Sequence, residues 1–457
     1  MDTPTRAIRL GSLDVNDVID RAPLGSFGLR VLILCGIIIL VDGFDVQFIT
    51  FAAPVLTQAL GVERSMLGPV FSSGLVGTML GALILSPLVD RVGRKLVLCG
   101  CILAFALCSF GTITATNISG LMVWRFVAGL GLGGATPIAV AFAAEFCPAR
   151  IRPTAVMIVY CGFAVGAGGG GLIASQLLPA FGWTSVFWLG GIVPLLMLAA
   201  VVSLMPESIG DLARRGRADR VAPLLRRIDP SVKIEPNAAV ELAAQETGFT
   251  VGRLFSDGRT VKTLVLWAMF FTNILTLYFM VSWFPTLANA SGLALPDAVR
   301  ASAMIQVGSI VGTLSLAALV RRFDTFKVMS LGYVGGAFAL VLVAFAGGGS
   351  VAYFTAVAFL AGFFVIGTQT GANAISALVY PGSMRSTGVG WALGIGRISS
   401  VIGPSLGGLL IGLNWPTKDL FIAAALPAIL AGISAYTLSR MLRDAPAEAV
   451  ARSGRLA

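Results

Sequence analysis

The sequence contains no histidine, and only 12% of its 457 residues are charged. Histidine is the side chain that titrates near neutral pH, so any proton transfer in this protein must use carboxylates. That charged fraction is well below the roughly 25% found in soluble domains. In addition, 56% of the chain is hydrophobic. The composition therefore excludes histidine chemistry and indicates that water is not the main solvent.

Cysteine is also sparse, and its spacing contains no CxxC pair. The six cysteines lie in or beside apolar runs of the first half, at Cys35, Cys99, Cys101, Cys108, Cys147 and Cys161. We interpret them as small core residues rather than metal ligands or disulfides. A nucleotide-binding loop, a metal cluster and a nucleophile constellation are all missing, so we expect no metal, no cofactor and no enzymatic activity.

Long apolar runs dominate what is present. Because lipid offers no hydrogen-bond partners, these runs must pair their backbone internally, as helices. Twelve spans are expected, at 28–50, 66–88, 96–115, 119–145, 154–179, 184–205, 262–287, 298–320, 326–347, 351–378, 386–412 and 418–441. The first 27 residues are polar and do not resemble a secretory signal, so the first run is kept as a span.

Basic residues predict the orientation, because cytoplasmic loops carry the lysine and arginine excess. With the N-terminus inside, the predicted outer loops hold only Arg64, Arg300 and Lys418. We therefore expect a multi-pass protein of the cell (inner) membrane with both termini in the cytoplasm. The net charge of +10 follows from this topology and requires no nucleic acid partner.

A polar stretch divides the chain into two similar halves. The sequence Pro148-Ala-Arg-Ile-Arg152-Pro-Thr154 recurs 233 positions later as Pro381-Gly-Ser-Met-Arg385-Ser-Thr387, as in transporters built from duplicated bundles. The predicted segments are an N-terminal segment (1–27), a six-helix bundle (28–205), a cytoplasmic linker with surface helices (206–260), a second six-helix bundle (261–441) and a C-terminal tail (442–457).

Two motifs resemble the major facilitator superfamily. Asp90-Arg-Val-Gly93-Arg94-Lys95 is similar to the superfamily's signature loop between helices 2 and 3, where glycine permits positive φ; Ser86 replaces its first glycine. Arg125 with the glycines that follow it resembles the superfamily's fourth helix. The resemblance implies an all-α membrane fold of twelve helices, in two six-helix bundles related by pseudo-twofold symmetry.

Charges inside the spans indicate a buried ion pair. Arg125 needs an anionic partner within the bilayer, and Asp42 and Asp45 lie in the otherwise apolar first span. Asp45 lies about 25 Å along helix 1 and Arg125 about 9 Å along helix 4 from the opposite side, which are comparable depths. Because arginine favours the ionised carboxylate, such a pair can couple substrate binding to protonation. The alternative is a purely structural ion pair.

Asp42-Gly43-Phe44-Asp45 also resembles the Asp-Gly-x-Asp motif of the aromatic acid:proton symporter family. The stretches that share this similarity are Ala144-Glu145-Phe-Cys-Pro148, Gly162-Phe-Ala-Val-Gly166, Pro206-Glu207-Ser208, Ser282-Trp283-Phe-Pro285 and Arg385-Ser-Thr-Gly-Val-Gly-Trp391-Ala-Leu-Gly-Ile-Gly-Arg397. The resemblance covers nearly the whole chain. It implies that Asp42, Asp45 and Arg125 couple transport to protons and that Arg385 and Arg397 are needed for transport.

Arg397 is the predicted anion-binding residue, because it falls near the bilayer midplane, where carrier sites form. Its guanidinium suits a carboxylate bidentately; the alternative is pairing with a helix carbonyl. The other candidates for the substrate site are the aromatic residues Phe44, Phe48, Tyr278, Trp283 and Trp391 as walls, and the amides Asn273, Gln306, Gln369 and Asn373 as partners of ring hydroxyls. Helix packing is the alternative for each amide.

A cytoplasmic gate is predicted where charged residues gather at helix ends, at Asp90, Arg94, Glu145, Arg152 and Arg385. Salt bridges there would close the inner side as the bundles rock. The predicted function is import of a hydroxybenzoate-like carboxylate by proton symport with alternating access, in a monomer. The alternatives are a proton-driven drug exporter, although the helix 5 glycine run lacks the exporter proline, and a sugar porter, although a mid-membrane arginine suits an anion better.

Overall fold

The computed structural model describes residues 13–215, 217–228, 240–241, 251–256, 259–346, 350–380 and 385–453. Within these ranges, twelve helical segments are long and apolar enough to cross a membrane, which confirms the predicted number of spans. The first six are α2 (Ser26–Leu60), α3 (Leu67–Val92), α4 (Arg94–Ile113), α5 (Ile118–Glu145), α6 (Arg152–Phe181) and α7 (Thr184–Leu204). The second six are α10 (Thr260–Ala290), α11 (Leu295–Val320), α12 (Thr325–Ala344), a composite of α13 (Val351–Ala361), the π-helical turn η3 (Gly362–Ile366) and α14 (Gly367–Val379), then α15 (Arg385–Gly412) and α16 (Thr417–Ser453).

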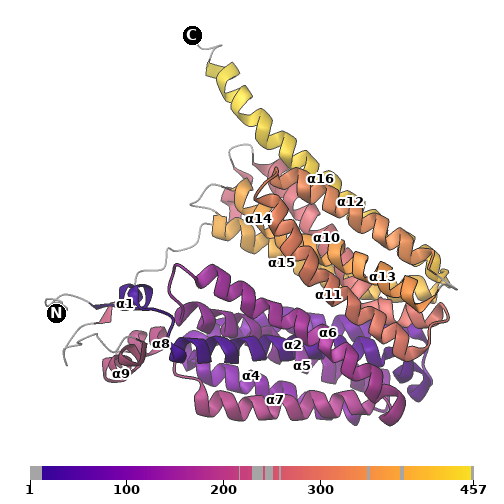
Figure 1. Cartoon of the computed structure of the whole chain (residues 1–457), viewed down its shortest axis with the longest axis horizontal. Coiled ribbons are helices and arrows are strands. Elements are labelled where there is room, and N and C mark those ends of the chain that lie inside the picture. The colour runs from indigo at the N-terminus through magenta and orange to yellow at the C-terminus, as the bar shows by residue number, and fades with distance from the viewer. Residues whose placement is uncertain are drawn as a thin grey trace.

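The twelve helices form two bundles that meet at an angle. Helices α2 to α7 make one bundle and α10 to α16 the other, and the two diverge toward the end where the short helices α8 (Ile209–Arg214) and α9 (Ala218–Ile228) lie (Figure 1). We call this the linker end and the opposite end the far end. The all-α, two-bundle architecture is the one predicted.

Glycines let helices within each bundle approach closely. A Cβ added to Gly133 of α5 would collide with the backbone of Thr78 in α3, and one added to Gly77 of α3 would collide with Phe126. The second bundle repeats this contact, since a Cβ on Gly362 would collide with the backbone of Ile305 in α11. Gly362 follows Gly129 of α5 by the same 233 positions found in the sequence repeat. Small residues are what membrane helices need for close backbone contact.

The bundles touch each other most closely toward the far end. The Ser72 hydroxyl on α3 donates to the carbonyl of Val401 on α15 at 2.6 Å and lies 2.7 Å from the Ser405 hydroxyl. Gly68 of α3 packs against Gly408 of α15, where a Cβ would have a backbone neighbour at 3.1 Å. These contacts close the structure at the far end.

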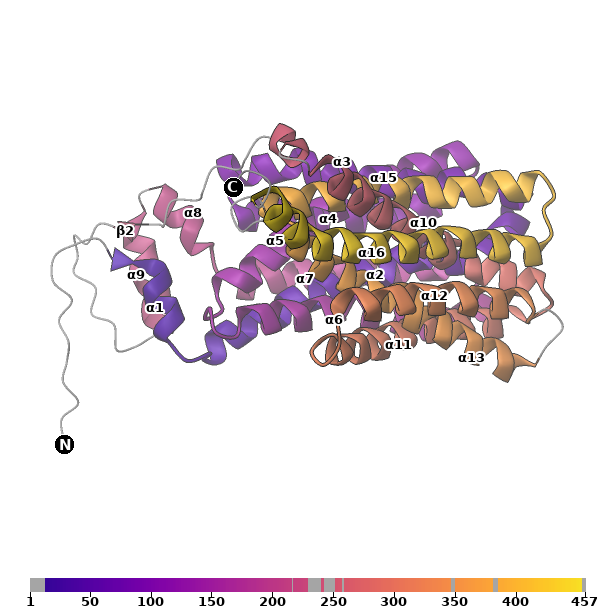
Figure 2. The same cartoon turned by 90° about the horizontal axis from the view of Figure 1, so that it is seen from above.

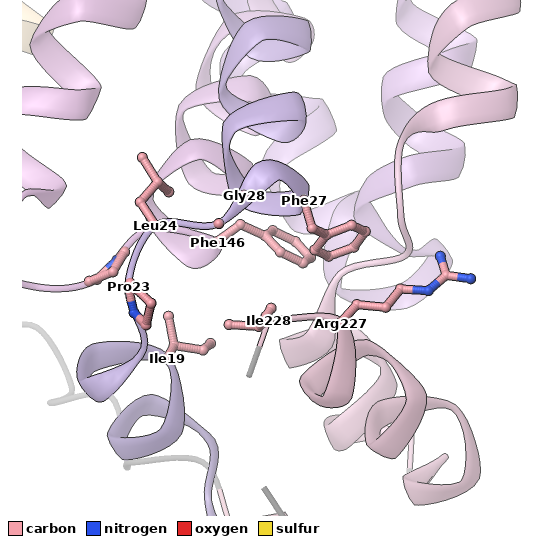
Figure 3. Close-up of a pocket in the computed structure, with 10 residues that line it drawn as sticks. Ile19, Pro23, Leu24, Phe27, Gly28, Phe146, Arg227 and Ile228 are labelled. Carbon is pink, nitrogen blue, oxygen red and sulfur yellow. The ribbon is translucent and has the colours of Figure 1, made fainter. Parts of the chain in front are cut away.

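Short elements at the linker end extend the first bundle. Helix α1 (Val15–Arg21) lies beside α9 (Figure 2), and the two-residue strands β1 (Leu13–Asp14) and β2 (Val240–Glu241) pair in parallel. Figure 3 shows Ile19 of α1 and Ile228 of α9 facing Phe27 and Phe146 around a small apolar pocket. The first part of the predicted linker is therefore packed on the first bundle.

Two local features depart from the expected spans. Helix α2 continues to Leu60, ten residues beyond the predicted end at 50, because its last turns are buried against neighbouring helices. The tenth span is interrupted by the π-helical turn η3, which periodicity alone does not reveal. The turn between α3 and α4 is as predicted, since Gly93 has a φ of 103°.

Candidate charge-coupling and substrate site

A buried ion pair joins α2 to α5 in the middle of the first bundle. The Arg125 guanidinium donates from both terminal nitrogens to Asp45, to Oδ1 at 3.0 Å and to Oδ2 at 2.8 Å. The two side chains are only 6% and 1% exposed. This fork geometry satisfies both carboxylate oxygens and is the strong form of such a pair.

Asp42 lies three residues earlier on α2 and does not bond to Arg125. Its Oδ2 accepts a hydrogen bond of 2.6 Å from the hydroxyl of Thr136 on α5. Asp42 is only partly buried, and the charge of Arg397 acts on it from the opposite bundle. The structure therefore separates two carboxylates that the sequence placed together.

Arg397 lies midway along α15 in the second bundle, close enough for its charge to act on Asp42. Its charge, with that of Asp42, acts on two phenols, Tyr160 of α6 and Tyr278 of α10. Within the part of the chain that the structure describes, the Arg397 guanidinium has no hydrogen bond or ion pair, and the residue is exposed. An arginine in this state, near the middle of the bundles, is suited to bind an anion.

A small cavity adjoins the buried pair between the two bundles. Arg125 lines it from the first bundle, and Tyr278 and Ser282 of α10 line it from the second. Its volume of about 30 Å³ is enough for one or two water molecules. In this conformation the cavity is too small for an aromatic acid.

The predicted aromatic walls have different environments. Phe44 and Phe48 are buried and contact each other, with ring centroids 3.7 Å apart. Trp283 is fully buried, and its indole N–H donates to the carbonyl of Pro404 at 2.9 Å, so here it packs α10 against α15. Trp391 is 43% exposed and stacks on Trp267.

The intramembrane amides are likewise divided. The side-chain amide of Asn273 on α10 donates to the side-chain oxygen of Gln369, which lies just after the π-helical turn. Such turns are frequent at functional sites. Gln306 is 3% exposed and packs against Gly168 of α6 between the bundles, whereas Asn373 is exposed.

Among the described residues, the predicted gate residues at the linker end belong to two separate groups. Arg94 donates to Glu145 at 2.9 Å, and Glu145 also accepts from the Ser208 hydroxyl and from the backbone of Gly210. Arg152 instead pairs with Asp20 of the N-terminal segment at 3.0 Å. The side chains of Asp90 and Arg385 lie outside the described residues.

Sequence reasoning missed Thr136 and Tyr160. Both are common residue types in apolar helices and belong to no recognised motif. Their positions relative to Asp42 depend on how α5 and α6 pack on α2. Glycines mark the contact of α2 with α6, where a Cβ on Gly43 would collide with the backbone of Phe163, but not the contact of α2 with α5. No group of three metal-ligating side chains occurs among the described residues.

The sequence profile of the Major Facilitator Superfamily matches residues 35–349 and 301–456. The chain belongs to this superfamily. It is 36% identical to the 4-hydroxybenzoate transporter PcaK of Pseudomonas putida, over 92% of this chain and 95% of that protein. It is 35% identical to a gallate transporter of Pseudomonas putida, over 92% and 94% of the two chains. It is therefore a transporter of the multi-pass membrane type and not an enzyme.

The fold agrees with solved transporter structures. A D-xylose-proton symporter superposes with a TM-score of 0.71, at 16% identity, over 90% of this chain and 97% of that one. The xylose transporter XylE of E. coli, in an inward open conformation, gives a TM-score of 0.68 at 16% identity, over 90% and 96%. At this identity the likeness shows the shared fold alone, which confirms the predicted major facilitator architecture.

Proposed function

We propose that this protein imports a hydroxybenzoate-like aromatic carboxylate by proton symport with alternating access. The observation that carries the proposal is Arg397, a guanidinium without a protein partner among the described residues that faces Asp42 across the two bundles. The names of its relatives support the substrate class, since they transport 4-hydroxybenzoate, gallate and benzoate. The protein acts as a monomer, and the proton is its only coupling ion.

Membrane energetics explain why a proton is needed. An aromatic carboxylate is an anion at neutral pH, and moving one negative charge inward against 100 mV costs about 2.3 kcal/mol. One accompanying proton makes the step electroneutral. The carboxylates Asp42 and Asp45 lie within the same bundle as Arg125 and are the groups available for that proton, because the chain has no histidine.

The orientation predicted from basic residues places the linker end on the cytoplasmic side of the inner membrane. The bundles diverge at that end and touch near Ser72 at the other (Figure 1). On this assignment the structure is the inward-facing state. The Arg94–Glu145 pair joins helix ends of the first bundle only and is formed in this open state; we assign it to positioning those helix ends for closure of the inner side.

A ligand panel tests the substrate class. Purified protein is heated with benzoate, 4-hydroxybenzoate, 3,4-dihydroxybenzoate, D-xylose or a cationic drug. A ligand present at 100 times its dissociation constant adds about 2.7 kcal/mol to the free energy of unfolding. We expect the aromatic acids alone to raise the melting temperature. Stabilisation by the sugar or the drug, without any by the acids, would contradict the proposal.

A further inference from the structure

The two carboxylates of the first span differ in what holds them. Both oxygens of Asp45 are bonded to Arg125, and the residue is 0% exposed. Protonating Asp45 would break the fork and leave the guanidinium of Arg125, itself 5% exposed, as an uncompensated buried charge. Asp45 is therefore poorly suited to gain and lose a proton in each transport cycle.

Asp42 is better suited than Asp45 to gain and lose a proton in each transport cycle. It is partly exposed, and only its Oδ2 has a hydrogen bond within the described residues, from Thr136. Thr136 is neutral, so protonation of Asp42 strands no buried charge beside it. The hydroxyl can also serve as an acceptor and stay bonded to a protonated carboxyl.

The charge that faces Asp42 is supplied by the other bundle. Arg397 of α15 acts on it across the interface, and Asp45 lies on the same helix. The phenols Tyr160 of α6 and Tyr278 of α10 lie within range of the charges of Asp42 and Arg397. Arg397 makes no ion pair or side-chain hydrogen bond among the described residues. A substrate carboxylate that binds Arg397 would therefore neutralise the charge that stabilises the ionised Asp42.

We propose that Asp42 is the carboxylate that takes up the coupling proton, and that the substrate carboxylate causes this by neutralising Arg397, whose charge otherwise stabilises the ionised Asp42. Asp45 and Arg125 then act as a permanent pair that positions α2 against α5. The inference rests on the proposed function and assigns the proton within it.

The charges balance at each step. With the site empty, the Asp42 carboxylate balances the Arg397 guanidinium. The substrate anion binds Arg397, and the Asp42 carboxylate gains one proton from the side of entry, so one negative and one positive charge enter together. After the bundles move, the substrate leaves, Asp42 releases its proton to the same side, and Asp42 again faces Arg397.

The test separates exchange from accumulation in reconstituted vesicles, with radiolabelled 4-hydroxybenzoate as the probe. Exchange is measured against unlabelled internal 4-hydroxybenzoate at equal pH, and accumulation with the interior one pH unit more alkaline. Initial rates in protein-free vesicles are subtracted, because the neutral acid crosses bilayers by itself. One proton per anion supports about tenfold accumulation per pH unit.

We expect Asp42→Asn to retain measurable exchange, while its uptake driven by the pH gradient falls to the initial rate of protein-free vesicles. The matched variant Asp45→Asn, three residues later, should lose exchange and accumulation together and melt at a lower temperature. Uptake by Asp42→Asn that is driven by the pH gradient at the wild-type rate would overturn the assignment, as would loss of gradient-driven uptake alone, with exchange retained, in Asp45→Asn.

A second variant keeps the test decisive if Asp42→Asn does not fold. Thr136→Val removes the one side-chain hydrogen bond that Asp42 has among the described residues, so the pH at which gradient-driven uptake is half-maximal should shift while the melting temperature stays close to wild type. An unchanged pH profile would contradict the inference. Failure of the proposed function is distinguishable, because the wild-type protein would then exchange none of the aromatic acids.

Discussion

Removing the charge of one member of the Asp45–Arg125 pair should destabilise the protein far more than removing both. The pair has two hydrogen bonds of 3.0 and 2.8 Å and is almost completely buried. Breaking a buried pair from one side costs about 3–5 kcal/mol, since a lone charge stays behind. That is a large fraction of the roughly 5–15 kcal/mol by which proteins are stable.

The double variant Asp45→Asn with Arg125→Gln leaves no lone charge, and its two amides can still bond to each other. We therefore expect it to lose less free energy of unfolding than either single variant. The assay is denaturant unfolding in mixed micelles, followed by tryptophan fluorescence, for the wild type, both single variants and the double variant. This double-mutant cycle isolates the interaction between the two side chains.

Asp297→Asn provides the control, because it breaks an exposed pair with Arg300 at 3.4 Å. Exposed pairs contribute only about 0.2–1 kcal/mol. Additive losses in the cycle, or a loss for Asp45→Asn no larger than that for Asp297→Asn, would refute the argument that this pair is a buried, permanent unit of the first bundle.

Three further predictions follow from the site and the packing. Arg397→Ala should weaken stabilisation by 4-hydroxybenzoate about 10- to 150-fold in affinity, the equivalent of the roughly 1.5–3 kcal/mol of a charged hydrogen bond; unchanged binding would exclude Arg397 from the substrate site. Gly133→Val should lower the free energy of unfolding by about 1–3 kcal/mol or more through overpacking, and the melting temperature with it. Gly100→Ala should leave both unchanged, because a Cβ there meets nothing within 4 Å. Glu145→Gln should slow vesicle uptake more than it weakens ligand binding, and equal losses of rate and affinity would argue against a gate.

Much of the fold could be predicted from the sequence because lipid imposes a local constraint. A run of about 20 apolar residues must be helical wherever it lies in the chain, since its backbone has no other hydrogen-bond partner. The short motif that repeats after 233 residues and the positive φ of Gly93 can likewise be recognised from short stretches of sequence. The interruption at 362–366 lies where Gly362 packs closely on the backbone of Ile305 in the neighbouring helix, and the sequence does not reveal that contact.

The sequence by itself determined which residues needed partners, and the tertiary structure decided which partners they have. A buried Arg125 required an anion. The sequence offered both Asp42 and Asp45 in the first span, with Asp45 at a comparable depth, but did not decide which of the two carries the proton. The packing of α2 on α5 turns Asp45 toward the guanidinium and Asp42 toward Thr136. The rotation of a helix about its own axis is set by long-range side-chain contacts, and for that reason only the folded protein distinguishes the two carboxylates.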